Sequence, residues 1–214
     1  MSEPPFAVAR LDELDRFEAE FVTIPVRIPL GITAFGVNAY AARENGGLII
    51  EEHDELGSGA GGHEELYVVV SGHARFGLAG EEIDAPLGTL VFVRDPAVRR
   101  SAHSAAPDTT ILVVGAQPGR AFEPSPWEAW LEALPHYRAG DYDAAVEVMR
   151  RALERHSDNP GVLYNLACCE ALAGRKDEAL AHLGHAVELE PKHAEYARTD
   201  SDLDAIRNEE GFPA

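Results

Sequence analysis

Two different patterns of hydrophobic and polar positions divide this chain near residue 120. Before that point, short runs rich in β-branched and aromatic residues alternate with clusters of glycine, asparagine and serine. Many short strands separated by turns predict an antiparallel sandwich or barrel over residues 21–119. The expected strands are Phe21–Ile28, Thr33–Ala41, Leu48–His53, Glu65–Val70, Ala74–Leu78, Thr89–Val93 and Thr109–Val114.

The flanks of this β region carry helical signals. Leu11, Leu14 and Phe17 are spaced by three, which predicts a short amphipathic helix or an ordered arm over residues 1–20. A linker is expected over residues 120–126, where the strand pattern stops. Ser125 then resembles a helix N-cap, and Glu128 would complete a capping box with it.

The helical part, residues 127–214, repeats itself with a period of 34. Small or apolar residues recur at four pairs of positions: Gly140 and Gly174, Ala145 and Ala179, Met149 and Leu183, Ala152 and Ala186. This pattern resembles the tetratricopeptide repeat, which implies helical hairpins that bind a protein partner. Pro135 is expected to interrupt the leading helix, and a final helix near Ala194–Asn208 is expected to cap the array.

Charge and cysteine content exclude several classes of function. The net charge is −19, divided almost evenly between the two halves, so binding to nucleic acid or to an anionic membrane surface is not expected. The two cysteines, Cys168 and Cys169, are adjacent, which favours a reduced, cytoplasmic protein. No apolar run approaches the length of a membrane span.

Two glycine-containing motifs in the β region carry a family resemblance. Glu65 is followed seven residues later by Gly72, and Gly88 opens the stretch Gly-Thr-Leu-Val-Phe-Val. In this pattern residues 30–117 resemble the cupin family, which implies an antiparallel jelly-roll barrel. The fold class expected for the whole chain is therefore a multidomain α and β protein, a cupin barrel followed by tetratricopeptide-like helices.

The resemblance also implies that the usual cupin metal site has been lost. Cupin metals are held by three histidines and a glutamate, and in this sequence Ser58, Ala60 and Arg99 occupy the histidine positions. Only Glu65 remains, and such a set cannot hold a transition metal. We therefore expect no cofactor and predict no catalytic residue.

The candidate ligand-binding residues are Glu65, Arg99 and Tyr67. If Arg99 points into the barrel like the histidine it replaces, it faces Glu65 as a structural ion pair, or it binds the carboxylate or phosphate of a ligand. In the other alternative, Arg99 lies with Arg94 and Arg100 on a solvated rim.

A displaced metal site is a second hypothesis for the barrel. His63 and Glu65 are two apart, so both point to one face of a regular strand, and His53 precedes the glycine-rich loop. His53 and Glu55 could stand for a displaced pair of cupin ligands. A set of His53, His63 and Glu65 suits iron, manganese or zinc.

These observations lead to two main hypotheses about function, besides the view that both halves are structural parts of a larger complex. In the first, the protein is a non-enzymatic module in which the barrel binds a small molecule or acts as a scaffold, and the repeats bind a protein partner. In the second, it is a metal-dependent cupin enzyme, an oxygenase or isomerase acting on a small substrate. Because two repeats bury little surface, a homodimer is also considered.

Overall fold

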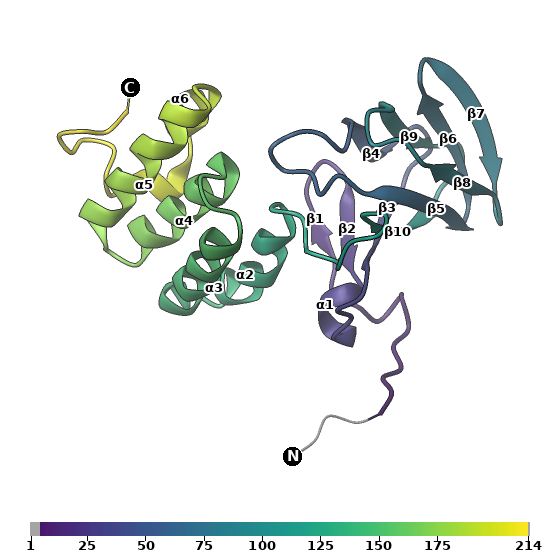
Figure 1. Cartoon of the computed structure of the whole chain (residues 1–214), viewed down its shortest axis with the longest axis horizontal. Helices are drawn as coiled ribbons and strands as arrows, with labels where there is room; N and C mark the ends of the chain where they lie inside the picture. The colour runs from purple at the N-terminus through teal and green to yellow at the C-terminus, as the bar shows by residue number, and fades with distance from the viewer. Residues whose placement is uncertain (1–4, 214) are drawn as a thin grey trace. The chain divides into compact units, whose positions relative to one another are not determined.

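Ten antiparallel strands and a four-residue helix make up the N-terminal part of the protein (Figure 1). The computed structural model describes residues 5–213. The strands are β1 (Phe17–Glu18), β2 (Val22–Pro25), β3 (Gly36–Ala42), β4 (Leu48–His53), β5 (Glu64–Ser71), β6 (His73–Leu78), β7 (Glu81–Pro86), β8 (Leu90–Val93), β9 (Arg100–Ser104) and β10 (Thr109–Ala116). Helix α1 (Arg27–Leu30) follows β2, where the sequence pattern had predicted a longer strand.

These strands form two sheets that enclose an apolar core. One sheet has the order β1-β2-β3-β10-β5-β8, and the other has the order β4-β9-β6-β7. The side chains that pack between the sheets are buried because alternate residues of each strand face inward. They include Ile49, Tyr67, Val69, Phe76, Ala102 and Ile111.

The N-terminal segment is an ordered arm. Leu11 and Leu14 pack against a cluster that contains Ile24 and Ala39 on the six-stranded sheet. Residues 11–13 form a turn, and Phe17 lies in β1, where it pairs with Thr23. The prediction of a helix here is wrong. Leu11 lies in a turn and Phe17 lies in a strand, so the spacing of three does not reflect a helix. Residues 1–4 of the predicted arm lie outside the described residues.

The C-terminal part consists of helices that pack in chain order. They are α2 (Glu128–Arg138), α3 (Tyr142–Arg155), α4 (Pro160–Leu172), α5 (Lys176–Leu189), α6 (Lys192–Ala197) and the 3-10 helix η1 (Ser201–Leu203). Asp141 and Asn159 cap α3 and α4 by accepting hydrogen bonds from backbone amides. Gly140 and Gly174 adopt positive φ values of 73° and 76° in the tight turns that close the two hairpins.

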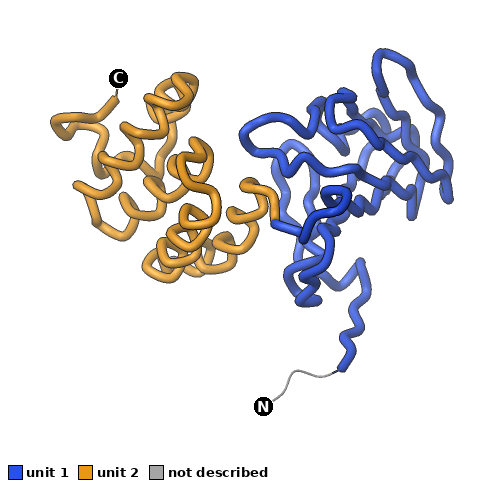
Figure 2. Tube along the Cα trace, viewed as in Figure 1, with its two compact units in different colours: residues 1–123 blue, residues 124–214 orange. Residues whose placement is uncertain are grey.

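The repeat predicted from the sequence forms the helical core. Ala145, Met149 and Ala152 are fully buried, and so are their counterparts 34 residues later. Two neighbouring apolar clusters result, one around α2–α4 and one around α4–α6. By contact density the chain divides into two units, residues 1–123 and residues 124–214 (Figure 2).

Three local predictions in the helical part are corrected. Helix α2 runs through Pro135 without interruption, at the loss of one backbone hydrogen bond. It begins at Glu128 rather than after a capping Ser125, and its N-cap residue Trp127 makes no side-chain cap.

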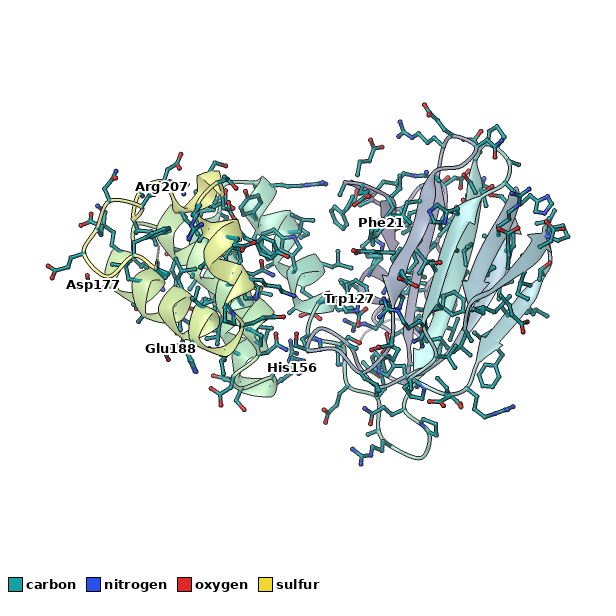
Figure 3. The ribbon with its side chains drawn as sticks, turned by 90° about the horizontal axis from the view of Figure 1, so that it is seen from above. Phe21, Trp127, His156, Asp177, Glu188 and Arg207 are labelled. Carbon is teal, nitrogen blue, oxygen red and sulfur yellow. The ribbon has the colours of Figure 1, made fainter. Side chains whose placement is uncertain are left out.

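The expected capping helix at 194–208 is also broken, because Asp200 accepts a hydrogen bond from the amide of Asp202 and starts η1. Arg207 then donates to the carbonyl oxygens of Ala197 and Asp200, 2.6 Å away in both cases (Figure 3). Among residues 5–213, no helix combines the length and apolar character needed to cross a membrane.

Candidate functional site

The barrel interior contains a polar cluster that begins on strand β5. Glu65 and Tyr67 are two residues apart and therefore project from the same face of the strand. The Tyr67 hydroxyl donates a hydrogen bond to the Glu65 carboxylate. The Tyr67 ring is 1% exposed and packs edge-on against Phe76, with ring centroids 5.6 Å apart. An acidic side chain is thereby held within an otherwise apolar core.

Arg100, on strand β9 of the opposite sheet, completes this cluster. Its side chain is fully buried, and its Nη2 lies 3.2 Å from Oε2 of Glu65. Its Nη1 donates to the backbone carbonyls of Pro96 and Val98, at 3.1 Å and 2.8 Å. The ion pair between Glu65 and Arg100 therefore joins the two sheets, since β5 and β9 belong to different ones.

The predicted partner of Glu65 was Arg99, and this prediction is wrong. Arg99 is exposed and donates to Glu52, with a distance of 3.1 Å between Nη2 and Oε2. Adjacent residues of an extended chain point to opposite faces, so a difference of one residue places Arg100 inside and Arg99 outside. The alternative in which Arg100 lies on a solvated rim is also wrong, because its side chain is buried. Sequence spacing alone did not identify Arg100 as an interior residue.

His53, Glu55 and Glu65 also come together in this unit. One nitrogen or oxygen atom from each lies within 4.8 Å of the atoms from the other two. The Nδ1 atom of His53 is 2.7 Å from the carbonyl oxygen of Glu51, so Nδ1 carries the proton and Nε2 is free to accept. That Nε2 is 3.8 Å from Oε1 of Glu55.

The glycine-rich loop after β4 positions Glu55. Its carboxylate is buried, and its Oε2 accepts hydrogen bonds from the backbone amides of Gly61 and His63 at 3.1 Å and 3.3 Å. The Gln117 side chain, which follows strand β10, donates to the carbonyl oxygen of Gly61 and ties the loop to that segment. Glu55 thus stands where the sequence had placed His63 in the predicted metal set.

His63 itself does not join His53 and Glu65. Its ring is buried against Phe122, with centroids 5.6 Å apart. Strand β5 begins at Glu64, so His63 precedes the regular strand and does not share the inward face of Glu65. The predicted set of His53, His63 and Glu65 is replaced by His53, Glu55 and Glu65.

Burial controls the protonation of this cluster. The pKa of Glu65 is raised, chiefly by loss of solvation and then by the negative charge of Glu55, against the opposing effects of Tyr67 and Arg100. The pKa of Tyr67 is raised well above its usual value, first by burial and then by the charge of Glu65. Tyr67 therefore remains a hydroxyl that donates to the carboxylate.

The donor set of His53, Glu55 and Glu65 fits a divalent ion. Ligand atoms on bonds of about 2.0–2.2 Å stand roughly 3.3–3.6 Å apart at a tetrahedral ion, so these atoms, which lie within 4.8 Å of one another, would have to move closer together to bind one. Oε1 of Glu55 is directed at the imidazole, while its other oxygen holds the loop. Three protein ligands would leave further coordination positions open, as in catalytic rather than structural sites.

A separate hollow lies on the outer face of the four-stranded sheet. Its volume is about 580 Å³, and Arg75, Arg99 and His103 line it together with Glu52 and Glu82. Arg100 does not line it, because inward and outward residues alternate along β9. The positive and negative side chains there include the exposed Arg99–Glu52 ion pair.

A second group of potential metal ligands in the helices is a hydrogen-bonded network. Cys168, Asp200 and Asp202 lie together, but Tyr164 and Tyr137 donate their hydroxyls to the two carboxylates. Burial raises the pKa of the Cys168 thiol, so it stays protonated and is a poor metal ligand. This group stabilises the position of η1 against α2 and α4.

Comparisons with known proteins give matches to both parts of the chain. The model of the tetratricopeptide repeat family matches residues 136–199. A cupin protein from Bacteroides fragilis is 18% identical, covers 57% of this chain and 93% of its own, and has a TM-score of 0.42. KdgF from a Halomonas species is 13% identical, with coverages of 53% and 93% and a TM-score of 0.40.

A further solved structure is that of a predicted oxalate decarboxylase from Thermotoga maritima. It is 17% identical, covers 51% of this chain and 97% of its own, and has a TM-score of 0.40. A search of curated protein sequences gives no match. The predicted architecture, an antiparallel β part followed by helices that carry the 34-residue repeat, is confirmed.

Proposed function

We propose that the barrel binds a small molecule and that the helical repeats attach it to a protein partner. The buried polar cluster of Glu65, Tyr67 and Arg100 carries the first part of this proposal. A barrel that served only as a structural core would gain more from apolar side chains in these positions, because desolvating an ion pair is costly. Polar groups converging inside an apolar enclosure are typical of ligand sites.

Native mass spectrometry of the purified full-length protein tests this proposal. We expect an additional bound mass on the wild-type protein that is lost in Glu65→Gln. Arg99→Gln is the matched control and should retain the bound mass, because Arg99 lies on the outer face. Retention of the same mass by Glu65→Gln would place the ligand elsewhere and contradict the proposal.

The partner of the repeats is proposed to be a basic or apolar peptide segment. Residues 123–214 contain nineteen acidic residues against two lysines and seven arginines, so an acidic partner would be repelled. A peptide array probed with the full-length protein should select basic or apolar sequences. Selection of acidic sequences would overturn this part of the proposal.

A second candidate function, a metal-dependent oxygenase or isomerase, is favoured by the His53–Glu55–Glu65 group. These three residues would hold a divalent iron, manganese or zinc ion, which supplies Lewis-acid or redox chemistry when bound. Metal analysis should use protein purified without chelators or an affinity tag. A stoichiometric metal that is lost in His53→Ala would support the enzyme, and a metal unchanged in that variant would exclude this site.

A further inference from the structure

The guanidinium of Arg100 donates hydrogen bonds through Nη1, but its other edge, formed by Nε and Nη2, donates none. Nη1 makes both backbone contacts, to the carbonyl oxygens of Pro96 and Val98. Nε and Nη2 reach hydrogen-bond geometry with no residue in the described range 5–213, although both atoms are completely buried and the Tyr67 hydroxyl and the Glu65 carboxylate lie close to the guanidinium. Nη2 is close to Glu65, at 3.2 Å, but the angle of approach is not that of a hydrogen bond.

This unused edge has a defined chemical complement. The N–H bonds of Nε and of one Nη2 hydrogen are parallel and lie in one plane, a geometry that matches the two oxygens of a carboxylate. Buried donors in folded proteins are almost always satisfied, by protein, by ordered water or by a ligand. The two backbone carbonyls that accept hydrogen bonds from Nη1 fix the orientation of the guanidinium, so the edge formed by Nε and Nη2 is already positioned.

We propose that Arg100 is the receptor for the carboxylate group of a small-molecule ligand, which it binds through Nε and Nη2. This inference rests on the proposed function, that the barrel holds a small molecule, and specifies the class of that molecule. A carboxylate is favoured over a phosphate because Glu65 and Glu55 stand beside the site. Their negative charges penalise a dianion more than a singly charged, planar group.

Neighbouring groups would hold the remainder of such a ligand. Tyr67 places its hydroxyl beside the Glu65 carboxylate, and the ring of Phe76 packs against Tyr67. A small organic acid thus meets polar groups at its carboxylate and apolar surface beyond it. Because the Arg100 side chain is fully buried, the surrounding side chains must move before a ligand reaches it.

Arginine side-chain NMR on the full-length protein tests the inference directly. The Nε–H signals of 15N-arginine-labelled protein are followed while sodium acetate, acetamide or sodium phosphate is added at constant ionic strength. Acetamide has nearly the shape of acetate but no charge. We expect acetate alone to shift the Arg100 signal in a saturable manner, and the signal of the exposed Arg99 to stay unchanged.

Substitutions then separate the effect of the paired donors Nε and Nη2 from the effect of the positive charge. Arg100→Lys keeps the positive charge but loses the paired donors, so acetate should bind about tenfold more weakly or worse. Arg99→Lys is the matched control and should bind acetate like the wild type. If Arg100→Lys does not fold, the titration of the wild-type protein decides alone, with the Arg100 signal assigned through its contacts with Val98 and Tyr67.

Three outcomes would overturn the carboxylate assignment, and they separate it from the proposed function. A shift of the Arg100 signal by phosphate or acetamide, but not by acetate, removes the carboxylate class and leaves small-molecule binding intact. Equal responses to all three probes mean that the fork has no selectivity for carboxylates. No response to any probe means that ordered water satisfies Nε and Nη2, and then both proposals fail at this site.

Discussion

At the scale of single residues, the first residue of strand β9, Arg100, places a positive charge in the barrel interior. Arg99 and Arg100 are chemically identical, yet one is paired with Glu52 at the surface and the other is buried beside Glu65. The difference follows from strand alternation alone. A buried guanidinium cannot lose its charge, so it requires a compensating group.

The first prediction is that Glu65 and Arg100 depend on each other for stability. Glu65→Met should lower the free energy of unfolding by about 3–5 kcal/mol, because it leaves a buried guanidinium without its counter-ion. The double variant Glu65→Met, Arg100→Met should recover much of that loss. Urea melts of the wild type, the two single variants and the double variant give the free energies of unfolding for this double-mutant cycle.

The matched control for this cycle is the exposed pair of Arg99 and Glu52. Its removal should change the free energy of unfolding little, since solvent screens exposed ion pairs. Small and additive effects at Glu65 and Arg100 would mean that the two side chains do not interact in solution.

The second prediction concerns His193, a buried histidine in the helical unit. Its ring stacks on Tyr164 with centroids 4.9 Å apart, and burial lowers its pKa below the model-peptide value. The unfolded chain therefore binds a proton more readily than the folded one. The stability that this neutral ring contributes is present above about pH 6.5 and is lost as the pH falls through its lowered folded-state pKa.

Urea melts of the full-length protein at about pH 7.5 and about pH 5 measure this effect. His193→Phe keeps the aromatic stack and should reduce the loss of stability of the helical unit at the lower pH. His185→Phe is the control, because 42% of the His185 side chain is exposed, against 8% for His193. An equal acid sensitivity in wild type and His193→Phe would assign the effect to other groups.

At the scale of elements, turns determine how the barrel strands pair. Strands β5 and β6 are joined directly at Gly72, which has a φ of 70°. A side chain there would meet backbone and side-chain atoms of Thr109, the nearest at 2.4 Å. The same threonine hydroxyl exchanges hydrogen bonds with the backbone of His73, so it cannot easily move away.

The third prediction follows from this close approach. Gly72→Ala should lower the free energy of unfolding of the barrel by about 2–4 kcal/mol, since it adds both backbone strain and overpacking. Gly80→Ala is the matched control. Gly80 has a φ of 86° but open space around it, so its variant should lose only about 1 kcal/mol. Equal losses in thermal or urea melts would show that contact with Thr109 adds nothing.

At the scale of the whole molecule, the chain divides into its two units after Glu123, within the linker expected over residues 120–126. Phe122 packs on the ring of His63 and lies 3.2 Å from the position that a Cβ on Gly36 would occupy. The guanidinium of Arg27 lies over the same ring, 5.8 Å from its centroid. Phe122 therefore packs as part of the barrel unit, although its neighbours Ala121 and Glu123 are exposed.

The fourth prediction tests this boundary with fragments. Residues 1–123 should fold and melt at a higher temperature than residues 1–119, because the shorter fragment loses the contacts of Phe122. The variant Phe122→Ala in the longer fragment should lose most of the difference. Identical melting temperatures of the two fragments, measured by circular dichroism, would show that residues 120–123 do not stabilise the barrel.

The sequence by itself determined those features that depend on local pattern. The 34-residue period predicts buried Ala145 and Ala179, because the packing partners of each helix lie in the next helix along the chain. Most barrel strands were visible as β-branched runs. Strands β7 and β9 were not, since β7 is rich in acidic residues, and β9 directs an arginine, an alanine and a serine inward.

Only the tertiary structure decided the composition of the polar cluster. Residue spacing placed Glu65 in the interior and grouped it with His53, but it could not determine that Glu55, rather than His63, is the third member of the group. Spacing selected Arg99 instead of Arg100, and because side chains alternate between the two faces, an error of one residue changes the face. The cluster is assembled from strands of both sheets, and contacts between segments so distant in sequence depend on strand pairing that no local pattern specifies.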